Sequence, residues 1–280
     1  MQGDGGADVL LMGTFHLGPP PGWQLSPALE SGLSRADRFV LEVDPRLATE
    51  DAVSDLLARR MFLEPPSELK DVVSPETAKL LEELDDELIA IGIPANARRR
   101  MKPWFVVMSL IEVNYRGSGY SADRGAEQII MRSLSDRPLV GLESFEEQIA
   151  ILDDMSPMLQ DLMLRHVLMR LGEALDDIRE LVSAWQRGDE TRLQELARQG
   201  VDVLPELEAF YDILSSERNR SWLPKLRAYL DEPTYAGETV FIGVGASHLI
   251  GDDGLVDLLR EAGYSVEPID HLREPGAEVP

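Results

Sequence analysis

Four short apolar runs divide the chain, and each is continuous rather than alternating with polar residues. They cover residues 9–13, 39–43, 138–143 and 239–245. Continuous apolar runs of this length are typical of strands covered on both faces, as in a parallel sheet. A weaker run at 265–269 contains Pro268, which favours an edge strand or a strand end. The pattern predicts a central sheet that is largely parallel or mixed.

Helical patterns fill the stretches between these runs. Ser74 and Pro75 supply an N-cap and a first-turn proline before residues 76–92. Ser144 opens a capping box ahead of the next helical segment. The apolar stretch 104–113 is too short to span a membrane, so it predicts a buried helix. Strands alternating with helices predict an α/β fold in which helices flank the sheet.

One long segment lacks any strand pattern. From about residue 156 to residue 231 the apolar spacing is helical throughout. We therefore expect a long all-helical insert, 156–231, before the last strands. The insert leads back to the sheet, so residues 1–280 are expected to form a single α/β domain.

Composition narrows the possible partners. The 280 residues include 51 acidic and 27 basic side chains, a net charge of −24. A charge this negative repels phosphate backbones, so no nucleic acid partner is expected, and no transmembrane segment is predicted. The first residues lack the pattern of a signal peptide, which favours a cytoplasmic protein, or an exported one if a leader was removed. The sequence does not set the oligomeric state.

The absence of cysteine limits the chemistry. With no Cys, a thiolate nucleophile and a Cys-ligated metal centre are excluded, so a metal site must use His, Asp or Glu. Of the four histidines, His166 lies in an apolar helical segment and His271 in the C-terminal tail. We expect His166 to be packed and His271 to be solvated. His16 and His248 are left as the candidate ligands.

Polar residues follow the predicted strands. His16 ends a Gly-x-x-His motif after the first run, Glu42 lies in the second, Glu143 ends the third, and His248 ends another Gly-x-x-His after the fourth. The carboxyl ends of parallel strands line a common crevice, and glycine lets the backbone turn sharply there. Two imidazoles and a carboxylate suit a divalent ion such as Zn²⁺, Mn²⁺ or Co²⁺ with a position open for water. Such an ion would supply hydroxide at neutral pH.

Several of these segments carry a family resemblance. They read VLLMGTFHLG, FVLEVD, LVGLESFEEQI and FIGVGASHLIGDDGLVDLLREAGYSVE. Together they resemble the TraB/GumN family, whose wider clan includes Tiki-type metalloproteases, erythromycin-esterase-like hydrolases and ChaN-like haem-binding lipoproteins. The resemblance spans nearly the whole chain. It implies a metal-dependent hydrolytic site formed by His16, Glu42 and His248.

Two further motifs are shared with that family. Arg218-Asn219 matches an Arg-Asn pair that precedes a helix, and Lys102 opens a Lys-Pro-Trp motif. We assign Arg218 or Lys102 to the developing negative charge of the reaction and Asn219 to the surroundings of the site. Many relatives begin with an exported leader, and the first residues of this sequence do not show that pattern, so the resemblance does not by itself imply export.

Each candidate also has a structural interpretation. For His16 and for His248, the alternative is a structural histidine that only forms hydrogen bonds. Glu42 in an apolar strand needs a metal, Arg or His partner, and a buried ion pair with Arg218 is the structural alternative. Glu143 precedes a helix and would complement its dipole, and Asp123 either lines the crevice or starts the next helix.

The sequence therefore predicts a metal-dependent hydrolase that acts on a peptide or on a small-molecule ester. A metal-free, esterase-like hydrolase stays open as an alternative, with His and Glu activating water directly. A non-enzymatic protein that binds haem, iron or a peptide is the other alternative. No Walker loop or dinucleotide fingerprint is present, which disfavours nucleotide binding.

Overall fold

The computed structural model describes residues 5–20, 22–24 and 26–269, so His271 lies outside the described part. The chain divides into two compact units. The sheet unit comprises Met1–Asp44, Ser121–Leu142 and Ser215–Pro280, and the helical unit comprises Pro45–Tyr120 and Glu143–Leu214. The expected insert 156–231 is helical, but its last helix belongs to the sheet unit.

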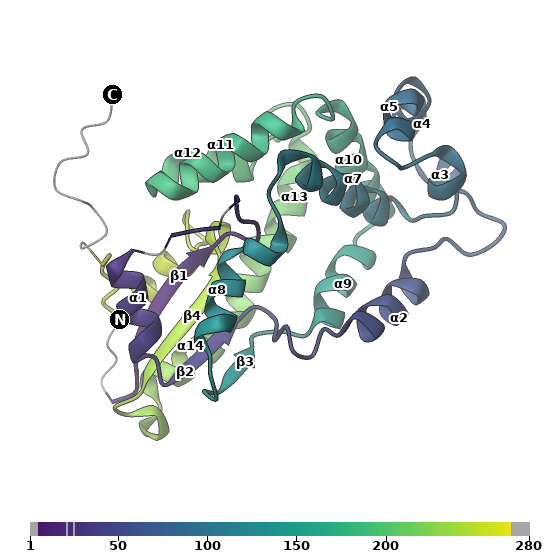
Figure 1. Cartoon of the computed structure of the whole chain (residues 1–280). Coiled ribbons are helices and arrows are strands. Elements are labelled where there is room, and N and C mark those ends of the chain that lie inside the picture. Colours follow the sequence, from purple (N-terminus) through teal and green to yellow (C-terminus); the bar gives the residue numbers. More distant parts are fainter. Residues whose placement is uncertain (1–4, 21, 25, 270–280) are drawn as a thin grey trace, which may run out of the picture. The chain divides into compact units, whose positions relative to one another are not determined.

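A four-stranded parallel sheet forms the centre of the sheet unit (Figure 1). Its strands, in the spatial order β1-β4-β2-β3, are β1 (Asp8–Thr14), β4 (Thr239–Gly245), β2 (Arg38–Leu41) and β3 (Leu139–Gly141). The predicted α/β fold is confirmed, and all four apolar runs contain a strand. The weaker run at 265–269 forms no extended strand, although Ser265 takes part in an isolated β-bridge. Pro268 has no N–H to donate to a ladder.

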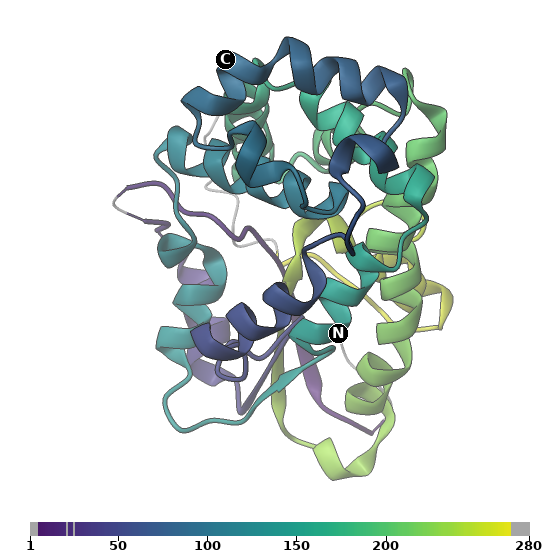
Figure 2. The same ribbon diagram turned by 90° about the vertical axis from the view of Figure 1, so that its right-hand side faces the viewer.

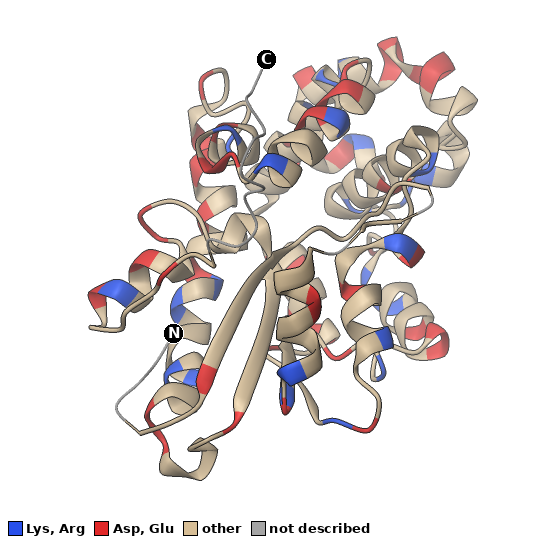
Figure 3. Cartoon of the chain, turned by 60° about the vertical axis from the view of Figure 1, so that its left-hand side comes forward, with Lys and Arg blue, Asp and Glu red and all other residues tan. Residues whose placement is uncertain are grey.

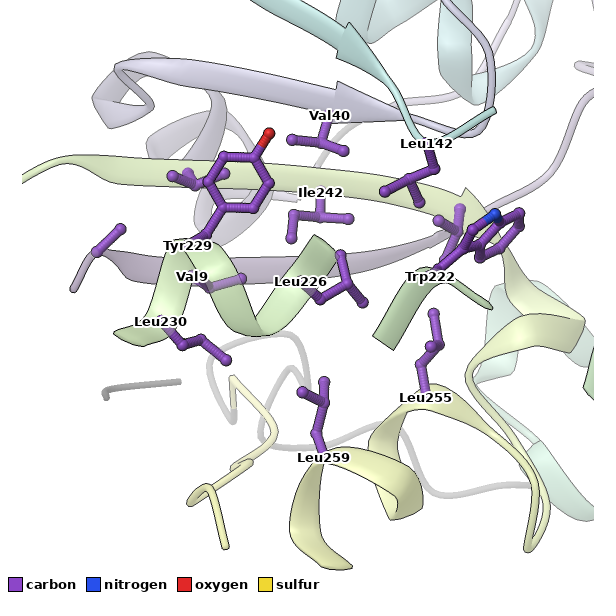
Figure 4. Packing of buried hydrophobic residues seen from close by; sticks show 13 residues of the cluster. Val9, Val40, Leu142, Trp222, Leu226, Tyr229, Leu230, Ile242, Leu255 and Leu259 are labelled. Carbon is purple, nitrogen blue, oxygen red and sulfur yellow. The ribbon is translucent and has the colours of Figure 1, made fainter. Parts of the chain in front are cut away.

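Helices cover both faces of this sheet. Side chains alternate along the strands, so Phe241 faces one layer while its neighbours Val240 and Ile242 face the other. The first layer contains α1 (Pro27–Arg35) and α8 (Ala126–Ser133). The second contains α14 (Glu217–Asp231) and α15 (Leu255–Glu261), and Figure 4 shows its packing. Burial on both faces explains why the strands are continuous apolar runs.

The helical unit contains no strand among its described residues (Figure 2). Its larger helices are α2 (Glu50–Arg60), α4 (Pro75–Glu83), α5 (Asp85–Ala90), α7 (Pro103–Ser118), α9 (Phe145–Asp153), α10 (Pro157–Met169), α11 (Ala174–Arg187) and α12 (Glu190–Ala197). Shorter turns of helix are α3 (Leu69–Val72), α6 (Ala95–Arg98) and α13 (Glu208–Tyr211). Trp104, Leu110 and Leu164 are fully buried in its core.

The predicted helix starts are confirmed. The Ser74 side chain accepts from Thr77 N, and Ser144 forms a reciprocal capping box with Glu147. The predicted helix at 76–92 is broken at Leu84, between α4 and α5. The buried guanidinium of Arg98 donates to the carbonyl of Leu81, which a continuous helix would use for its own hydrogen bond.

Charged side chains lie mainly on helices and loops, and the strands are almost free of charge (Figure 3). This distribution keeps most of the acidic excess in contact with solvent. None of the described helices combines the length and apolar character needed to cross a membrane.

Candidate functional site

Three charged or polar side chains meet at the carboxyl ends of β2 and β4. Glu42 directly follows β2, His248 lies in the 3-10 turn Ala246–His248 after β4, and Arg218 lies in the first turn of α14. Arg218 Nη2 donates to Glu42 Oε2 over 2.6 Å, and Arg218 Nη1 lies 3.0 Å from His248 Nε2. All three side chains are largely buried: Glu42 is 12% exposed, His248 is 5% exposed and Arg218 is 13% exposed. We call these three residues the strand-end cluster.

Glu42 is held in its ionised form. Burial opposes ionisation, but the positive charges of Arg218, His16 and, at the acid pH where Glu42 titrates, His248 outweigh it and hold the pKa of Glu42 at about 2. The backbone N–H of Gly245 adds a hydrogen bond of 2.7 Å to Glu42 Oε1. The carboxylate is therefore fixed by a guanidinium on one oxygen and by the start of the turn after β4 on the other.

His248 is neutral at neutral pH. Burial lowers its pKa to about 4, and the charges of Arg218 and His16 act in the same direction against the opposing effect of Glu42. Its ring packs against Trp222, with 4.6 Å between ring centroids. Asn219 Oδ1 lies 2.7 Å from His248 Nδ1. This buried imidazole thus has one nitrogen facing Arg218 and the other facing Asn219.

His16 has a different environment. Its side chain is 68% exposed, and its Nδ1 lies 2.8 Å from Glu127 Oε1 on α8. Desolvation opposes protonation, but the hydrogen bond to Glu127 and the charges of Glu127 and Glu42 raise the pKa of His16 to about 9. His16 is therefore cationic at neutral pH, whereas His248 is not.

The three expected site residues converge around Gly245. A Cβ atom placed on this glycine would lie 3.2 Å from Glu42 Oε1, 3.5 Å from His248 Cδ2 and 3.9 Å from His16 Nε2. Glycine leaves this space at the strand end open, as the Gly-x-x-His pattern suggested. The convergence is geometric, and the chemical roles of these residues stay predictions.

These groups are not arranged to hold a divalent cation. In the part of the chain that the structure describes, no group of three or more His, Cys, Asp or Glu side chains is arranged to hold a metal ion. Glu42 and His248 both direct their acceptor atoms at the Arg218 guanidinium, which carries a permanent positive charge. A cation could bind there only after displacing that head group, so the described arrangement does not fit the expected ion.

The other expected residues have different positions. Asn219 joins the site through His248, whereas Asp123 lies exposed in the 3-10 turn Ala122–Arg124. Lys102 and Glu143 belong to the helical unit. Glu143 is half-buried directly before the N-cap of α9.

Lys102 has a partner within the helical unit. Its Nζ lies 2.5 Å from Asp153 Oδ1, and the same oxygen accepts from Trp104 Nε1 over 2.9 Å. Arg60 Nη1 donates to Asp153 Oδ2 over 3.3 Å. The Lys-Pro-Trp motif therefore holds the end of α9 to the start of α7.

Glu127 is the residue that the sequence analysis missed. It precedes the buried residues Ile130 and Leu134 by three and seven positions, so it lies on the apolar stripe of α8. An acidic residue on such a stripe requires a partner, because an unpaired carboxylate is costly to bury. The position of Glu127 on the apolar stripe of α8 was the feature of the sequence that could have identified it.

This arrangement belongs to an α/β protein with two Gly-x-x-His turns at one edge of its sheet. A family model matches residues 2–268, and the chain is thus a member of the TraB/PrgY/gumN family. It is 26% identical, over 259 residues, to two proteins described as uncharacterized protein YbaP, from Escherichia coli (strain K12) and Shigella flexneri. Each match covers 89% of this chain and 87% of the relative. No solved structure matches the chain.

Proposed function

We propose that this protein hydrolyses peptide or ester bonds at the strand-end cluster. The observation that supports this most is the Arg218 guanidinium, which lies in hydrogen-bond reach of both the Glu42 carboxylate and His248. A fixed cation beside a carboxylate offers a group for the developing oxyanion and a group that takes a proton from water. The resemblance to hydrolytic clan members supports the same reaction class.

In the proposed reaction, Arg218 donates an N–H to the carbonyl oxygen of the substrate. Turning part of the guanidinium toward substrate weakens its hold on Glu42 and raises the pKa of that carboxyl. Glu42 then takes a proton from the attacking water as the oxygen–carbon bond forms. Cationic His16 gives its Nε2 proton to the leaving amine or alcohol as the acyl bond breaks. A proton transfer from Glu42 back to His16 restores both groups.

A hydrolase that uses a divalent ion is the second candidate. The convergence of His16, Glu42 and His248 around Gly245 favours it, since these side chains are the expected nitrogen and oxygen ligands. A bound Zn²⁺, Mn²⁺ or Co²⁺ would polarise the carbonyl and lower the pKa of water. This version requires the Arg218 head group to leave its present position.

Hydrolysis of p-nitrophenyl butyrate and of fluorescein-labelled casein tests the proposal. We expect Glu42→Gln and Arg218→Met each to lower the rate by about 100-fold or more. Glu30→Gln, a change of the same type at an exposed position of α1, is the control and should leave the rate unchanged. Unchanged hydrolysis in Glu42→Gln would overturn the proposed role of the cluster.

Elemental analysis and chelation separate the two versions of the reaction. Hydrolysis that survives 1,10-phenanthroline, in protein without bound metal, supports the metal-free version. Activity that is lost on chelation and restored by Zn²⁺, Mn²⁺ or Co²⁺ supports the metal-dependent version. If both substrates remain intact and added haem gives a shifted Soret band that His16→Ala abolishes, the protein is a haem carrier instead.

A further inference from the structure

Each Gly-x-x-His histidine contacts a polar residue from a different helix through its Nδ1 atom. His16 Nδ1 lies 2.8 Å from Glu127 Oε1 on α8, and His248 Nδ1 lies 2.7 Å from Asn219 Oδ1 on α14. Asn219 is only 1% exposed, and Glu127 is mostly buried. Neither partner is one of the strand-end residues themselves.

The hydrogen bonds around His248 fix the position of its proton. Asn219 Nδ2 donates to the carbonyl of His248 over 3.1 Å and to that of Asp253 over 2.8 Å. These two carbonyls orient the amide, so that Oδ1 is the atom facing the imidazole and can only accept. The Nδ1 atom of His248 must therefore carry the proton.

The other side of the ring gives the same result independently. A guanidinium has donors and no acceptor, so Arg218 Nη1 can only donate to His248 Nε2. A proton on Nε2 would place two donors 3.0 Å apart. Asn219 and Arg218 thus select one tautomer from opposite sides of the imidazole.

His16 is held by a comparable device. The carboxylate of Glu127 lies 2.8 Å from Nδ1 as an ion-pair partner, and a negative charge at this distance favours a proton on that nitrogen. The start of α8 is also fixed to the backbone beside His16, since Ala126 N donates to the Phe15 carbonyl over 3.0 Å. The remaining nitrogen, Nε2, lies toward Gly245, 3.9 Å from where a Cβ atom on that glycine would lie.

Both partners occupy places where an apolar residue is expected. Glu127 lies on the apolar stripe of α8, and Asn219 precedes the buried residues Trp222 and Leu226 by three and seven positions on α14. A polar group at such a place is stable only when its hydrogen bonds are satisfied. The hydrogen bond with His248 supplies this for Asn219, and the ion pair with His16 gives Glu127 a charged partner.

We propose that Glu127 and Asn219 are paired positioning residues, each of which keeps a proton on Nδ1 of one histidine, so that Nε2 of His248 faces Arg218 and Nε2 of His16 lies toward Gly245. The effect of this positioning on catalysis rests on the proposed function, whereas the assignment of the two tautomers is independent of it. Partners that orient metal-ligating histidines typically contribute 10- to 100-fold to metal affinity or activity, and we expect an effect of similar size from these two residues.

Side-chain ¹⁵N NMR of the full chain tests the tautomers without a substrate. At neutral pH we expect His248 to carry its proton on Nδ1 alone, with an N–H signal that exchanges slowly because the bond to Asn219 is buried. Asn219→Ala should remove this signal. The control is Arg220→Gln, which breaks an exposed contact with Asp253 on the same helix and should retain it. A proton on His248 Nε2 would overturn the inference.

For His16, the matched changes are on α8. Above pH 9, where the wild-type His16 ring is neutral, we expect Glu127→Ala to move His16 toward a mixture of tautomers, whereas Glu127→Gln keeps an acceptor and preserves the Nδ1 proton. Gln128→Ala, at the exposed neighbouring position, is the control. A wild-type pattern in Glu127→Ala would count against the assigned contact.

Kinetics with p-nitrophenyl butyrate test the positioning role. We expect Asn219→Ala and Glu127→Ala to lower kcat by about 10- to 100-fold while KM stays within about twofold. Urea denaturation confirms that each variant is folded. An unchanged kcat in folded variants would refute the positioning role. Absence of hydrolysis in the wild type, with the Nδ1 pattern intact, would contradict the proposed function and leave the tautomer assignment standing.

Discussion

The Arg218 guanidinium donates to Glu42 over 2.6 Å, a hydrogen bond between residues 176 positions apart. It connects the end of β2 to the first turn of α14. The guanidinium also lies over the Trp222 ring, 4.6 Å from its centroid. The pair is largely withdrawn from water, so its charges are screened less than those of an exposed pair.

Removing one member of this pair should destabilise the fold strongly. In Arg218→Met, the ionised Glu42 loses its guanidinium partner at a largely buried position, and we expect the free energy of unfolding to fall by about 3 to 5 kcal/mol. Urea denaturation at neutral pH measures the change. Arg220→Met removes an exposed pair with Asp253 on the same helix and should cost less than about 1 kcal/mol. Equal costs in the two variants would contradict the buried pair.

Acid should destabilise the protein through Glu42. The pKa of Glu42 is lowered from 4.5 to about 2 by folding, so its contribution is present above pH 4.5 and is lost as the pH falls toward 2. The shift corresponds to roughly 3 kcal/mol. Unfolding experiments from pH 7 downward should therefore show wild type and Glu42→Gln converging below pH 4.5. A constant difference between the two would be evidence against this shift.

His248 should act in a pH window that lies higher than that of Glu42 and overlaps it only near pH 4. Burial lowers its pKa from 6.5 to about 4, so the neutral ring stabilises the fold at high pH and this contribution is lost as the pH falls from 6.5 to 4. Histidine NMR titration measures the pKa directly. An observed value near 6.5 would contradict the buried, neutral ring.

Filling the space at Gly245 should affect chemistry more than stability. In Gly245→Ala, the new methyl group would lie 3.2 Å from Glu42 Oε1 and 3.9 Å from His16 Nε2, so these side chains must shift slightly. We expect a loss of hydrolysis of about 10-fold or more, because small displacements are costly in an active site. The free energy of unfolding should change by less than about 1 kcal/mol. Gly172→Ala, where a Cβ meets nothing within 4 Å, should leave the rate unchanged.

The Lys-Pro-Trp motif should matter for stability of the helical unit. Asp153→Ala leaves the donors of Lys102, Trp104 and Arg60 without their acceptor, and we expect a loss of about 3 kcal/mol or more in urea denaturation. Asp154→Ala, at the exposed neighbouring position, should be close to neutral. A cost for Asp153→Ala no larger than that control would show that the motif has another role.

Much of the sheet could be predicted from the sequence because its strands are buried on both faces. The run at 239–245 matches β4 residue for residue, and the Ser144 capping box is read from local sequence alone. The break at Leu84 could not be read in this way. It depends on Arg98, which reaches a carbonyl of α4 only after the chain has folded.

At the candidate site, too, the sequence identified residues but not the contacts that they make in the folded chain. The motifs at the strand ends identified His16, Glu42 and His248 as candidate site residues, and these three side chains converge at Gly245. Their protonation could not be predicted, because it depends on burial and on the charges of Arg218 and Glu127, which come from other elements. Lys102 carries a conspicuous motif, yet its ammonium pairs with Asp153. Motifs locate chemistry-bearing residues, whereas the partners that set their charge are fixed by packing.

The strand order also has a consequence for synthesis of the protein. In the described sheet β4 lies between β1 and β2, although it is the last of the four strands to leave the ribosome. The nascent chain must carry β1 and β2 for about two hundred residues before the strand that joins them exists, and such long-range pairing is slow and exposes apolar segments. A growing chain released before β4 is made could pair β2 only with β3, and it would lack both the strand that joins β1 to them and the second histidine motif, leaving apolar strands for chaperones to shield.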